Sequence, residues 1–288
     1  MKNLFIILLL TIFTISAEAQ YNTDKLSNVN LKKPSPLSVI PFDKNISEEQ
    51  SEKPGDFSFR VNLYLWALSI DGSTALPMNN PSLPPQTPVA DVKLKFSDAI
   101  KYVKMAAMLA GRFEYKNFGF LYDIYYVKLG YNASVPVQSG YIDADLTAKQ
   151  FTGDLEISYK FPIKNKNIYS LGYAGARISS LDNTLDLFQA NQPVLNVNFS
   201  KTWVDPIIGA DATFLFSKHW FSYFKGDVGG FGISSKFTGM ILGVAGYRFT
   251  DNWNATLGFK YLYMDYDKDN FLWKVNQYGL LLSFGYIF

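Results

Sequence analysis

The chain lacks cysteine altogether and contains a single histidine, His219. Without cysteine it can form no disulfide, thiolate-bound zinc, iron–sulfur centre, thiol nucleophile or lipidated cysteine. One histidine leaves little scope for a histidine metal site or proton relay, so we expect no metal and no cofactor. Charge is also scarce, because only 18% of the 288 residues are charged. The net charge of +2 is too small for the electrostatic footprint of a nucleic-acid-binding protein.

Long apolar runs are absent after the first residues. Lys2 opens a short positive region, Leu4 to Ile15 is apolar apart from two threonines, and Ala17-Glu18-Ala19 places small residues before Gln20. This pattern predicts a cleaved signal peptide over residues 1–19, the alternative being an uncleaved anchor helix. No later segment reaches the ~18 consecutive apolar residues of a membrane-spanning helix. A secreted soluble β protein and an outer-membrane barrel therefore remain.

Residues 20–56 are polar, contain four prolines and show no sustained periodicity. We interpret them as a disordered periplasmic linker. The rest of the chain is different, since aromatic residues make up 17% of the whole sequence, with 24 Phe and 19 Tyr. Such a composition argues against disorder in residues 57–288.

From Phe57 onward apolar and polar residues alternate with a period of two, which is the signature of β-strands. In the first segment Phe57, Phe59, Val61 and Leu63 face one way. Ten such segments are expected, at about Phe57–Ile70, Tyr102–Tyr115, Phe118–Tyr131, a fourth ending near Phe161, Ile168–Asp182, Val197–Phe216, Trp220–Gly230, Phe237–Phe249, Trp253–Asp265 and Gln277–Phe288.

Segments with one apolar and one polar face fit a transmembrane barrel whose apolar face meets lipid. In a soluble sandwich the apolar face would form the core instead. Aromatic residues gather at the strand ends, as the interfacial belt of a membrane barrel requires. We therefore predict an all-β protein, a transmembrane antiparallel up-and-down β-barrel of about ten strands, with eight or twelve possible because the fourth to sixth segments are the least regular.

The connections alternate between short and long. Short ones are expected at Lys116-Asn117, Pro162–Asn167, Ser217-Lys218 and Thr250–Asn252. Longer loops are expected at Asp71–Ile100, around Asn132–Gly140 and Asn183–Asn196, and at Asp267–Asn270. Short periplasmic turns and longer outside loops are typical of outer-membrane barrels. An even strand number places both ends of the barrel in the periplasm.

The last segment alternates up to a terminal aromatic residue. Tyr286 and Phe288 complete a face that also carries Tyr278, Leu280 and Phe284. This ending resembles the C-terminal assembly signal of outer-membrane barrels. The expected partners are therefore outer-membrane lipid and the barrel assembly machinery, with the protein a monomer in the outer membrane.

Several longer motifs resemble those of an uncharacterised family of Gram-negative outer-membrane β-barrel proteins. The resemblance covers residues 57–288 and implies a barrel in the outer membrane but no established activity. It is carried by Leu63-Tyr64-Leu65-Trp66-Ala67, by Lys95 to Ile100 (with Lys95 a departure), by W-x-D-P-x-x-G at Trp203–Gly209, by G-D-x-G-G-F-G at Gly226–Gly232, and by G-Y-R-F at Gly246–Phe249, echoed with Lys at Gly258–Tyr261.

Charged residues on the polar faces should point into the barrel. A barrel of eight to ten strands is narrow, and an unpaired buried charge is costly, so we predict an ion-pair network that fills the lumen. A narrow polar channel is the alternative. The predicted lumen residues are Arg60, Lys104, Arg112, Glu114, Asp123, Asp154, Glu156, Arg177, Asp205, Asp211, Lys225, Asp227 and Lys260.

Few residues could carry catalysis or bind metal. Asp265, Asp267 and Asp269 begin like a calcium loop, but Asn270 replaces its glycine and Asn276 its final glutamate. Outer-membrane enzymes resemble one another in needing a histidine near the outer rim, whereas His219 falls in an expected periplasmic turn. We therefore expect a structural or surface-interaction barrel and no enzyme. A narrow pore for small polar solutes is the first alternative, and a lipid-modifying enzyme the second.

Overall fold

Antiparallel strands dominate the computed structural model, which describes residues 57–77, 89–137, 140–190 and 192–288. The predicted signal peptide (1–19) and linker (20–56) lie outside the described residues. Among these residues, no helix combines the length and the hydropathy needed to cross a membrane.

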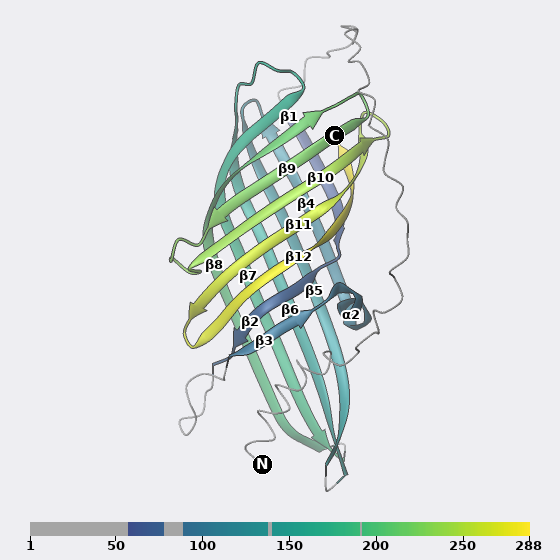
Figure 1. The fold of residues 1–288 in the computed structure, drawn as a ribbon, viewed down its shortest axis with the longest axis vertical. Coiled ribbons are helices and arrows are strands. Elements are labelled where there is room, and N and C mark those ends of the chain that lie inside the picture. The colour runs from purple at the N-terminus through teal and green to yellow at the C-terminus, as the bar shows by residue number, and fades with distance from the viewer. Residues whose placement is uncertain (1–56, 78–88, 138–139, 191) are drawn as a thin grey trace, which may run out of the picture. The chain divides into compact units, whose positions relative to one another are not determined.

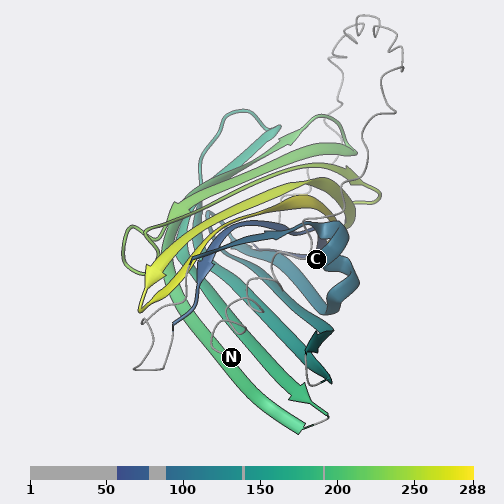
Figure 2. The ribbon, with the colours of Figure 1, turned by 60° about the horizontal axis from the view of Figure 1, so that its bottom comes forward.

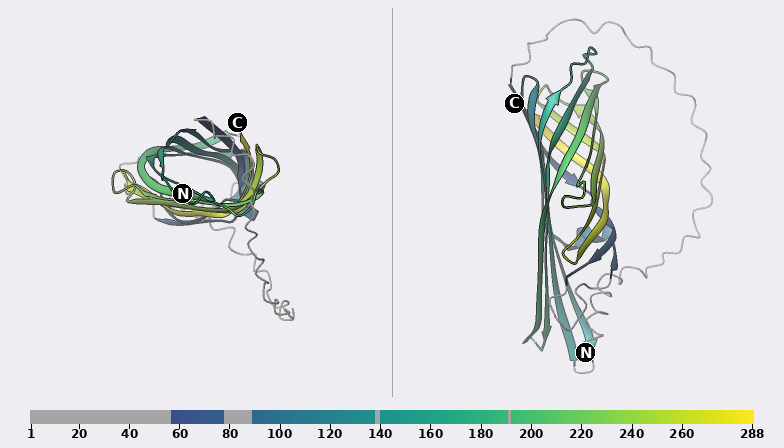
Figure 3. Two further views of the ribbon diagram at one scale, coloured as in Figure 1. Left: turned by 90° about the horizontal axis from the view of Figure 1, so that it is seen from above. Right: turned by 90° about the vertical axis from the view of Figure 1, so that its left-hand side faces the viewer.

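Ten strands close into a barrel (Figures 1 and 3) because β1 pairs with both β4 and β12. Each of the other nine pairs with its sequence neighbour in the order β4 to β12. The predicted ten-stranded, all-β antiparallel barrel is confirmed. The strands are β1 (Phe57–Trp66), β4 (Val103–Tyr115), β5 (Phe118–Val137), β6 (Gly140–Lys160), β7 (Ile168–Gln189), β8 (Gln192–Leu215), β9 (Trp220–Gly229), β10 (Phe237–Arg248), β11 (Trp253–Lys268) and β12 (Phe271–Ile287).

Two short strands and a helix occupy the predicted first long loop. Strand β2 (Ser69–Ala75) continues along β12 where β1 stops, and β3 (Ala90–Leu94) pairs with β2. Helix α2 (Phe96–Tyr102) then leads directly into β4. The twelve-stranded sheet is thus a ten-stranded barrel with a two-stranded extension.

The two ends of the barrel differ. Short connections of residues 116–117, 161–167, 216–219 and 249–252 all lie at one end, together with the C-terminus, as predicted. We call this the turn end, and it is uppermost in Figure 1. We call the opposite end the loop end. In an outer-membrane barrel the short turns face the periplasm.

Strands β5 to β8 reach much further than predicted at the loop end. Residues 132–140 and 183–196 were expected to be long loops, which is wrong: only residues 138–139 and 190–191 separate the paired strands. Four strands therefore project beyond the rest of the wall, at the bottom of Figures 1 and 2.

The loops were mispredicted because the polarity of the two faces inverts along these strands. In the projecting part Ala144, Leu185 and Leu187 are buried, whereas Asp145 is exposed. The alternation persists, but the polar side now faces outward, as it must where water replaces lipid. The prediction assumed an apolar outer face along the whole strand. It therefore ended each strand where the outer face becomes polar.

In the ten-stranded part of the wall, nearer the turn end, the predicted facing is confirmed. Leu63 is 66% exposed and Ile157 is 70% exposed on the outside, whereas Glu156 and Arg177 are each 1% exposed. Large aromatic side chains form a belt around the turn end, consistent with a membrane interface. The exposed members of this belt are Phe57, Tyr115, Phe118, Phe161, Phe216, Trp220, Phe249, Trp253 and Phe288.

The C-terminal residue takes part in the closure between β12 and β1. The backbone N–H of Phe288 donates to the carbonyl of Phe59 at 2.9 Å, and the two rings stack at 5.1 Å. The ring of Phe59 stacks in turn on Phe113 at 4.1 Å. Phe288 thereby extends the seam that leaves no strand edge open to lipid, where each unpaired backbone group would cost several kcal/mol.

Deletion of Phe288 is expected to lower the outer-membrane level of the protein sharply and to expose it to periplasmic degradation. The deletion removes both the terminal aromatic of the assembly signal and the last contact of the seam. Immunoblots of membrane and soluble fractions measure the effect. Phe216→Ala, which removes another belt aromatic, serves as the control and should retain its membrane level. Wild-type protein released without detergent would overturn the membrane assignment.

Candidate functional site

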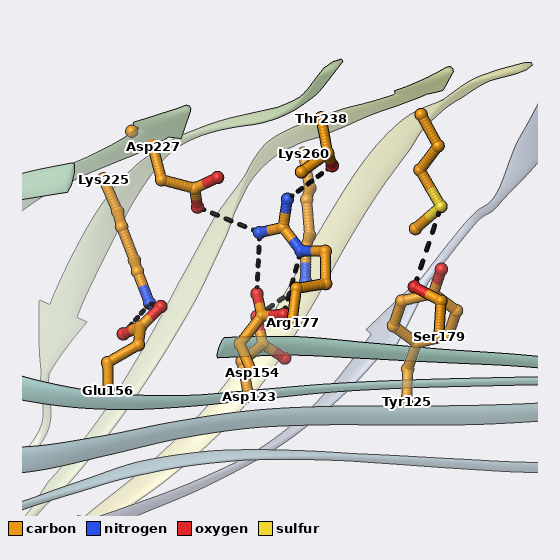
Figure 4. Close-up of polar contacts among 12 residues, drawn as sticks. Asp123, Tyr125, Asp154, Glu156, Arg177, Ser179, Lys225, Asp227, Thr238 and Lys260 are labelled. Carbon is orange, nitrogen blue, oxygen red and sulfur yellow. Dashed lines mark hydrogen bonds and ion pairs between the residues drawn. The ribbon is translucent and has the colours of Figure 1, made fainter. Parts of the chain in front are cut away.

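Besides the contacts of Arg177, three ion pairs between described residues cross the lumen from strands that are not neighbours. Each joins side chains from opposite parts of the wall, so the pairs bridge the bore instead of lining it. Two of them appear in Figure 4. The pairs are Arg112 of β4 with Asp211 of β8 at 2.5 Å, Lys225 of β9 with Glu156 of β6 at 2.7 Å, and Lys260 of β11 with Asp123 of β5 at 2.6 Å.

Arg177 on β7 is the most highly connected residue of the network. Its guanidinium donates to both carboxylate oxygens of Asp154, at 2.9 and 2.8 Å, and to Asp227 on β9 at 3.0 Å. A further bond runs to the hydroxyl of Thr238 on β10 at 3.0 Å. The planar fork of arginine suits such paired acceptors, so one buried side chain ties four strands together (Figure 4).

Aromatic rings surround the ammonium of Lys260. Its Nζ lies 5.1 Å from the ring centroid of Trp66, 5.3 Å from that of Tyr64 and 5.6 Å from that of Tyr125. The Tyr64 hydroxyl also donates to Asp123 at 2.6 Å, on the carboxylate that pairs with Lys260. Cation–π attraction therefore supplements the ion pair where little water is available.

A second group of charges lies nearer the turn end. Glu114 accepts a hydrogen bond from the Tyr169 hydroxyl and lies 3.7 Å from Arg60 and 3.6 Å from Arg112. Arg60 and Arg112 are direct partners across the β1–β4 ladder. Like charges directly opposite each other repel, and the shared carboxylate offsets that repulsion.

Two predicted lumen residues behave differently from the rest. Lys104 is exposed and follows a register shift in the β4–β5 ladder, and its methylene stem covers Gly130. The bulge turns Lys104 out of the lumen, so its assignment to the lumen network is wrong. Asp205 is fully buried as predicted, but it accepts bonds from the backbone N–H and hydroxyl of Ser235 at 2.7 and 2.6 Å. Asp205 therefore fixes the loop that contains Ser235, and it forms no ion pair with an arginine or lysine among the described residues.

The two motifs with the longest signatures form one structural unit. Asp205, from the W-x-D-P segment, fixes the β9–β10 loop that the G-D-x-G-G-F-G segment begins. Gly230, Phe231 and Gly232 all have positive φ angles, of 81°, 48° and 76°. Gly230 and Gly232 adopt such angles without strain, whereas Phe231 is a non-glycine residue in the left-handed region. Both motifs thus have structural roles.

An apolar cluster adjoins the ion pairs and was not predicted. Its buried members include Leu181, Met240, Leu262 and Met264, all on lumen-facing positions. Towards the loop end, rings from β8 meet the β11–β12 hairpin: Trp203 lies 4.6 Å from Tyr266, and Phe199 lies 4.7 Å from Phe271. The signal available in the sequence was the presence of leucine and methionine on otherwise polar faces.

The three aspartates that resembled the start of a calcium loop each pair with a different lysine. Asp265 lies 3.5 Å from Lys274, Asp267 lies 2.6 Å from Lys236, and Asp269 lies 2.5 Å from Lys201. The predicted loop at Asp267–Asn270 is shorter than expected, because β11 runs to Lys268 and β12 starts at Phe271. Asp265 therefore pairs within the β11–β12 hairpin, whereas Asp267 and Asp269 fix the hairpin to Lys236, just before β10, and to Lys201 on β8.

His219 lies in the β8–β9 connection at the turn end, as expected. Its Nδ1 is 2.9 Å from the backbone carbonyl of Arg248, and its ring stacks on Tyr247 at 5.6 Å. The side chain is exposed. These contacts pack His219 against the end of strand β10.

Comparisons with known proteins show the fold but no relative in sequence. No protein-family model matches the chain, and no curated protein matches it. The outer-membrane protease OmpT from Escherichia coli is similar in structure, with a TM-score of 0.52, 12% identity, 84% of this chain and 99% of that chain covered. The chain therefore has the fold of an outer-membrane β-barrel, with buried salt bridges in its lumen.

Two further solved structures align more loosely. The translocator domain of the autotransporter NalP from Neisseria meningitidis has a TM-score of 0.35 and 9% identity, with 80% of this chain and 88% of that chain covered. The attachment invasion locus protein Ail of Yersinia pestis has a TM-score of 0.32 and 13% identity, with 81% and 98% covered. Neither likeness bears on function.

Arg177→Gln is expected to lower the free energy of unfolding by about 3–5 kcal/mol, because Asp154 and Asp227 would be left buried without their cation. Lys149→Gln is the matched control: the ion pair of Lys149 with Asp182 has side chains 36% and 45% exposed, so its loss should cost about 0–1 kcal/mol. Urea titration of the refolded proteins in micelles measures both. Equal midpoints for the two variants would contradict a tightly paired lumen.

Proposed function

We propose that this protein is an integral outer-membrane barrel with a closed lumen, which serves a structural or surface-interaction role. The observation that carries the proposal is the set of ion pairs that cross the bore. A charged side chain that lies along the wall leaves room for water and solutes in the centre of the bore. An ion pair between opposite strands occupies that centre. Ten strands enclose a lumen that side chains can fill.

The apolar cluster adds a second barrier. Ions passing Leu181, Met240, Leu262 and Met264 would lose their hydration without gaining ligands. Opening the bore would also separate buried charges from their partners, at a cost of several kcal/mol for each pair. A narrow pore for small polar solutes is the second candidate function, favoured by one observation: a cavity of about 180 Å³ between Arg60 and Lys225.

The projecting strands support the surface-interaction part of the proposal. In the described part of the chain, β4 pairs with β5 only as far as Leu129, and β9 pairs with β8 only from Ile207 to Leu215. The sheet beyond these points has two edges with backbone groups available for contact. Its outer face is acidic, since Asp145 and Asp186 stand directly opposite each other across β6 and β7. Such a surface offers a binding site for a basic or extended partner.

The remaining expectations belong to the same proposal. Outer-membrane lipid covers the apolar band, the assembly machinery inserts the chain, and the protein is a monomer without enzymatic activity. The position of His219 at the turn end supports the absence of a histidine-based catalytic site at the outer rim. Membership of the uncharacterised outer-membrane family rests on the motifs around Asp205 and Asp227, to which the structure gives linked roles.

A closed lumen predicts that purified wild-type protein will insert into planar lipid bilayers without producing conductance steps. The ion pairs and the apolar cluster must part before ions can pass, so the bilayer should remain insulating at low voltage. A general porin measured in the same bilayers is the positive control, and insertion is checked by protease accessibility of reconstituted vesicles. Reproducible steps from wild-type protein would favour the pore.

The surface role predicts that shortening the projecting hairpins will reduce cell–cell aggregation and adhesion without unfolding the barrel. Asn-Gly turns joining Tyr131 to Leu146 and Leu185 to Val197 preserve the observed register. The urea midpoint should be retained, because the ion pairs of the lumen lie on the turn-end side of both cuts. A variant that changes only residues 138–139 and 190–191 to Asn-Gly is the control. Equal adhesion by both variants would remove the support for a surface role.

A further inference from the structure

The lumen is not completely filled near the turn end. A cavity of about 180 Å³ lies there, bounded by Asp123 and Leu281 on the inside and by Arg248 and Ile287 towards the turns. This space is large enough to hold several water molecules. It is connected to solvent at the mouth, where the Arg60 side chain is 36% exposed.

Positive charge predominates on the wall of this cavity. Arg60, Arg112, Lys225 and Arg248 all line it, whereas the carboxylate on the lining is that of Asp123. That carboxylate is already neutralised by Lys260 at 2.6 Å.

The carboxylates around the cavity do not balance the cations. Arg112 and Lys225 have close partners, and Arg60 shares Glu114 with Arg112 at 3.7 Å. Arg248 forms no ion pair with any residue in the part of the chain that the structure describes. At the mouth of the cavity, the cations are Arg60, Arg112 and Arg248, against the carboxylates of Glu114 and Asp211.

Two donor atoms of the arginines are buried without an acceptor. The Nε atoms of both Arg60 and Arg248 are inaccessible and lack a hydrogen-bond partner among the described residues. Neither guanidinium group donates a side-chain hydrogen bond to a described residue, so the outer N–H groups of both arginines can bind an acceptor in the cavity that they line.

Uncharged polar side chains complete the cavity. The side-chain amides of Asn62 and Asn254 both cover Gly285, where an added Cβ would lie 2.1 Å from Asn62 Oδ1 and 2.9 and 3.0 Å from Asn254 Oδ1 and Nδ2. The missing side chain at Gly285 therefore makes room for two amides beside the arginines. Thr256 and Ser283, whose hydroxyls lie 2.7 Å apart, line the same cavity.

We propose that this chamber binds a small oxyanion of the phosphate class, held by the guanidinium groups of Arg60 and Arg248 and by the neighbouring amides. Planar guanidinium groups match phosphate oxygens in geometry and charge. The binding site lies between the turn end and the ion pairs that close the bore, so an anion enters from the turn end. The anion balances the unpaired positive charge at the mouth.

The test is a calorimetric titration of the refolded protein with inorganic phosphate, in neutral detergent at constant ionic strength. Wild-type protein should bind phosphate saturably, and Arg248→Gln should bind it at least about tenfold more weakly, which corresponds to about 1.4 kcal/mol. Lys218→Gln removes an exposed lysine from a turn at the same end and should leave the affinity unchanged. Arg60→Gln provides a second variant, and urea midpoints confirm that each protein is folded.

The source of the phosphate is distinguished by a second arm in nanodiscs containing phosphatidylglycerol. Binding of inorganic phosphate in lipid-free detergent, lost in Arg248→Gln, supports a soluble anion. A phosphorus resonance of the lipid that differs between wild type and Arg248→Gln, without binding of inorganic phosphate, supports a lipid headgroup as the bound group. No saturable binding in either arm, or equal binding by wild type and Arg248→Gln, overturns the proposal.

Discussion

The need to neutralise charge inside a narrow, poorly hydrated bore governs the rest of this structure. A ten-stranded barrel leaves room for side chains but little for water, so each buried charge requires a partner. The partners come from across the lumen, as with Asp123 and Lys260 or Glu156 and Lys225. These contacts hold opposite walls together, and the same contacts occupy the path that a solute would take.

The bilayer imposes a second constraint. Its edge corresponds to the point along β5 to β8 where the outer face changes from apolar to polar. On the turn-end side of that point the outer face is apolar and the inner face carries the ion pairs. Beyond it, aspartates such as Asp145 face outward while Leu185 and Leu187 are buried. The projecting sheet therefore has the apolar inner face and polar outer face of a soluble β protein. Its exposed edges are suited to contact with a partner.

The motifs that resemble a family of outer-membrane barrels acquire a physical meaning from their contacts. Asp227 of the G-D-x-G-G-F-G segment binds Arg177, and Asp205 of the W-x-D-P segment holds the loop that this segment begins. One motif thus secures the centre of the bore and the other its loop end. The turn end is the part left with an unbalanced charge, at Arg248.

The sequence by itself determined the class of fold, the ten strands and most of the charged residues of the lumen, because a period of two and an apolar outer face are local properties of the chain. It could not identify the partners, since Arg112 and Asp211 are 99 residues apart and meet only when the barrel closes. Lys104 was misplaced because a bulge changes the facing of one residue without changing the composition. The height of β5 to β8, the apolar cluster and the cationic chamber were decided by tertiary structure, which alone sets where the bilayer ends and which side chains meet across the bore.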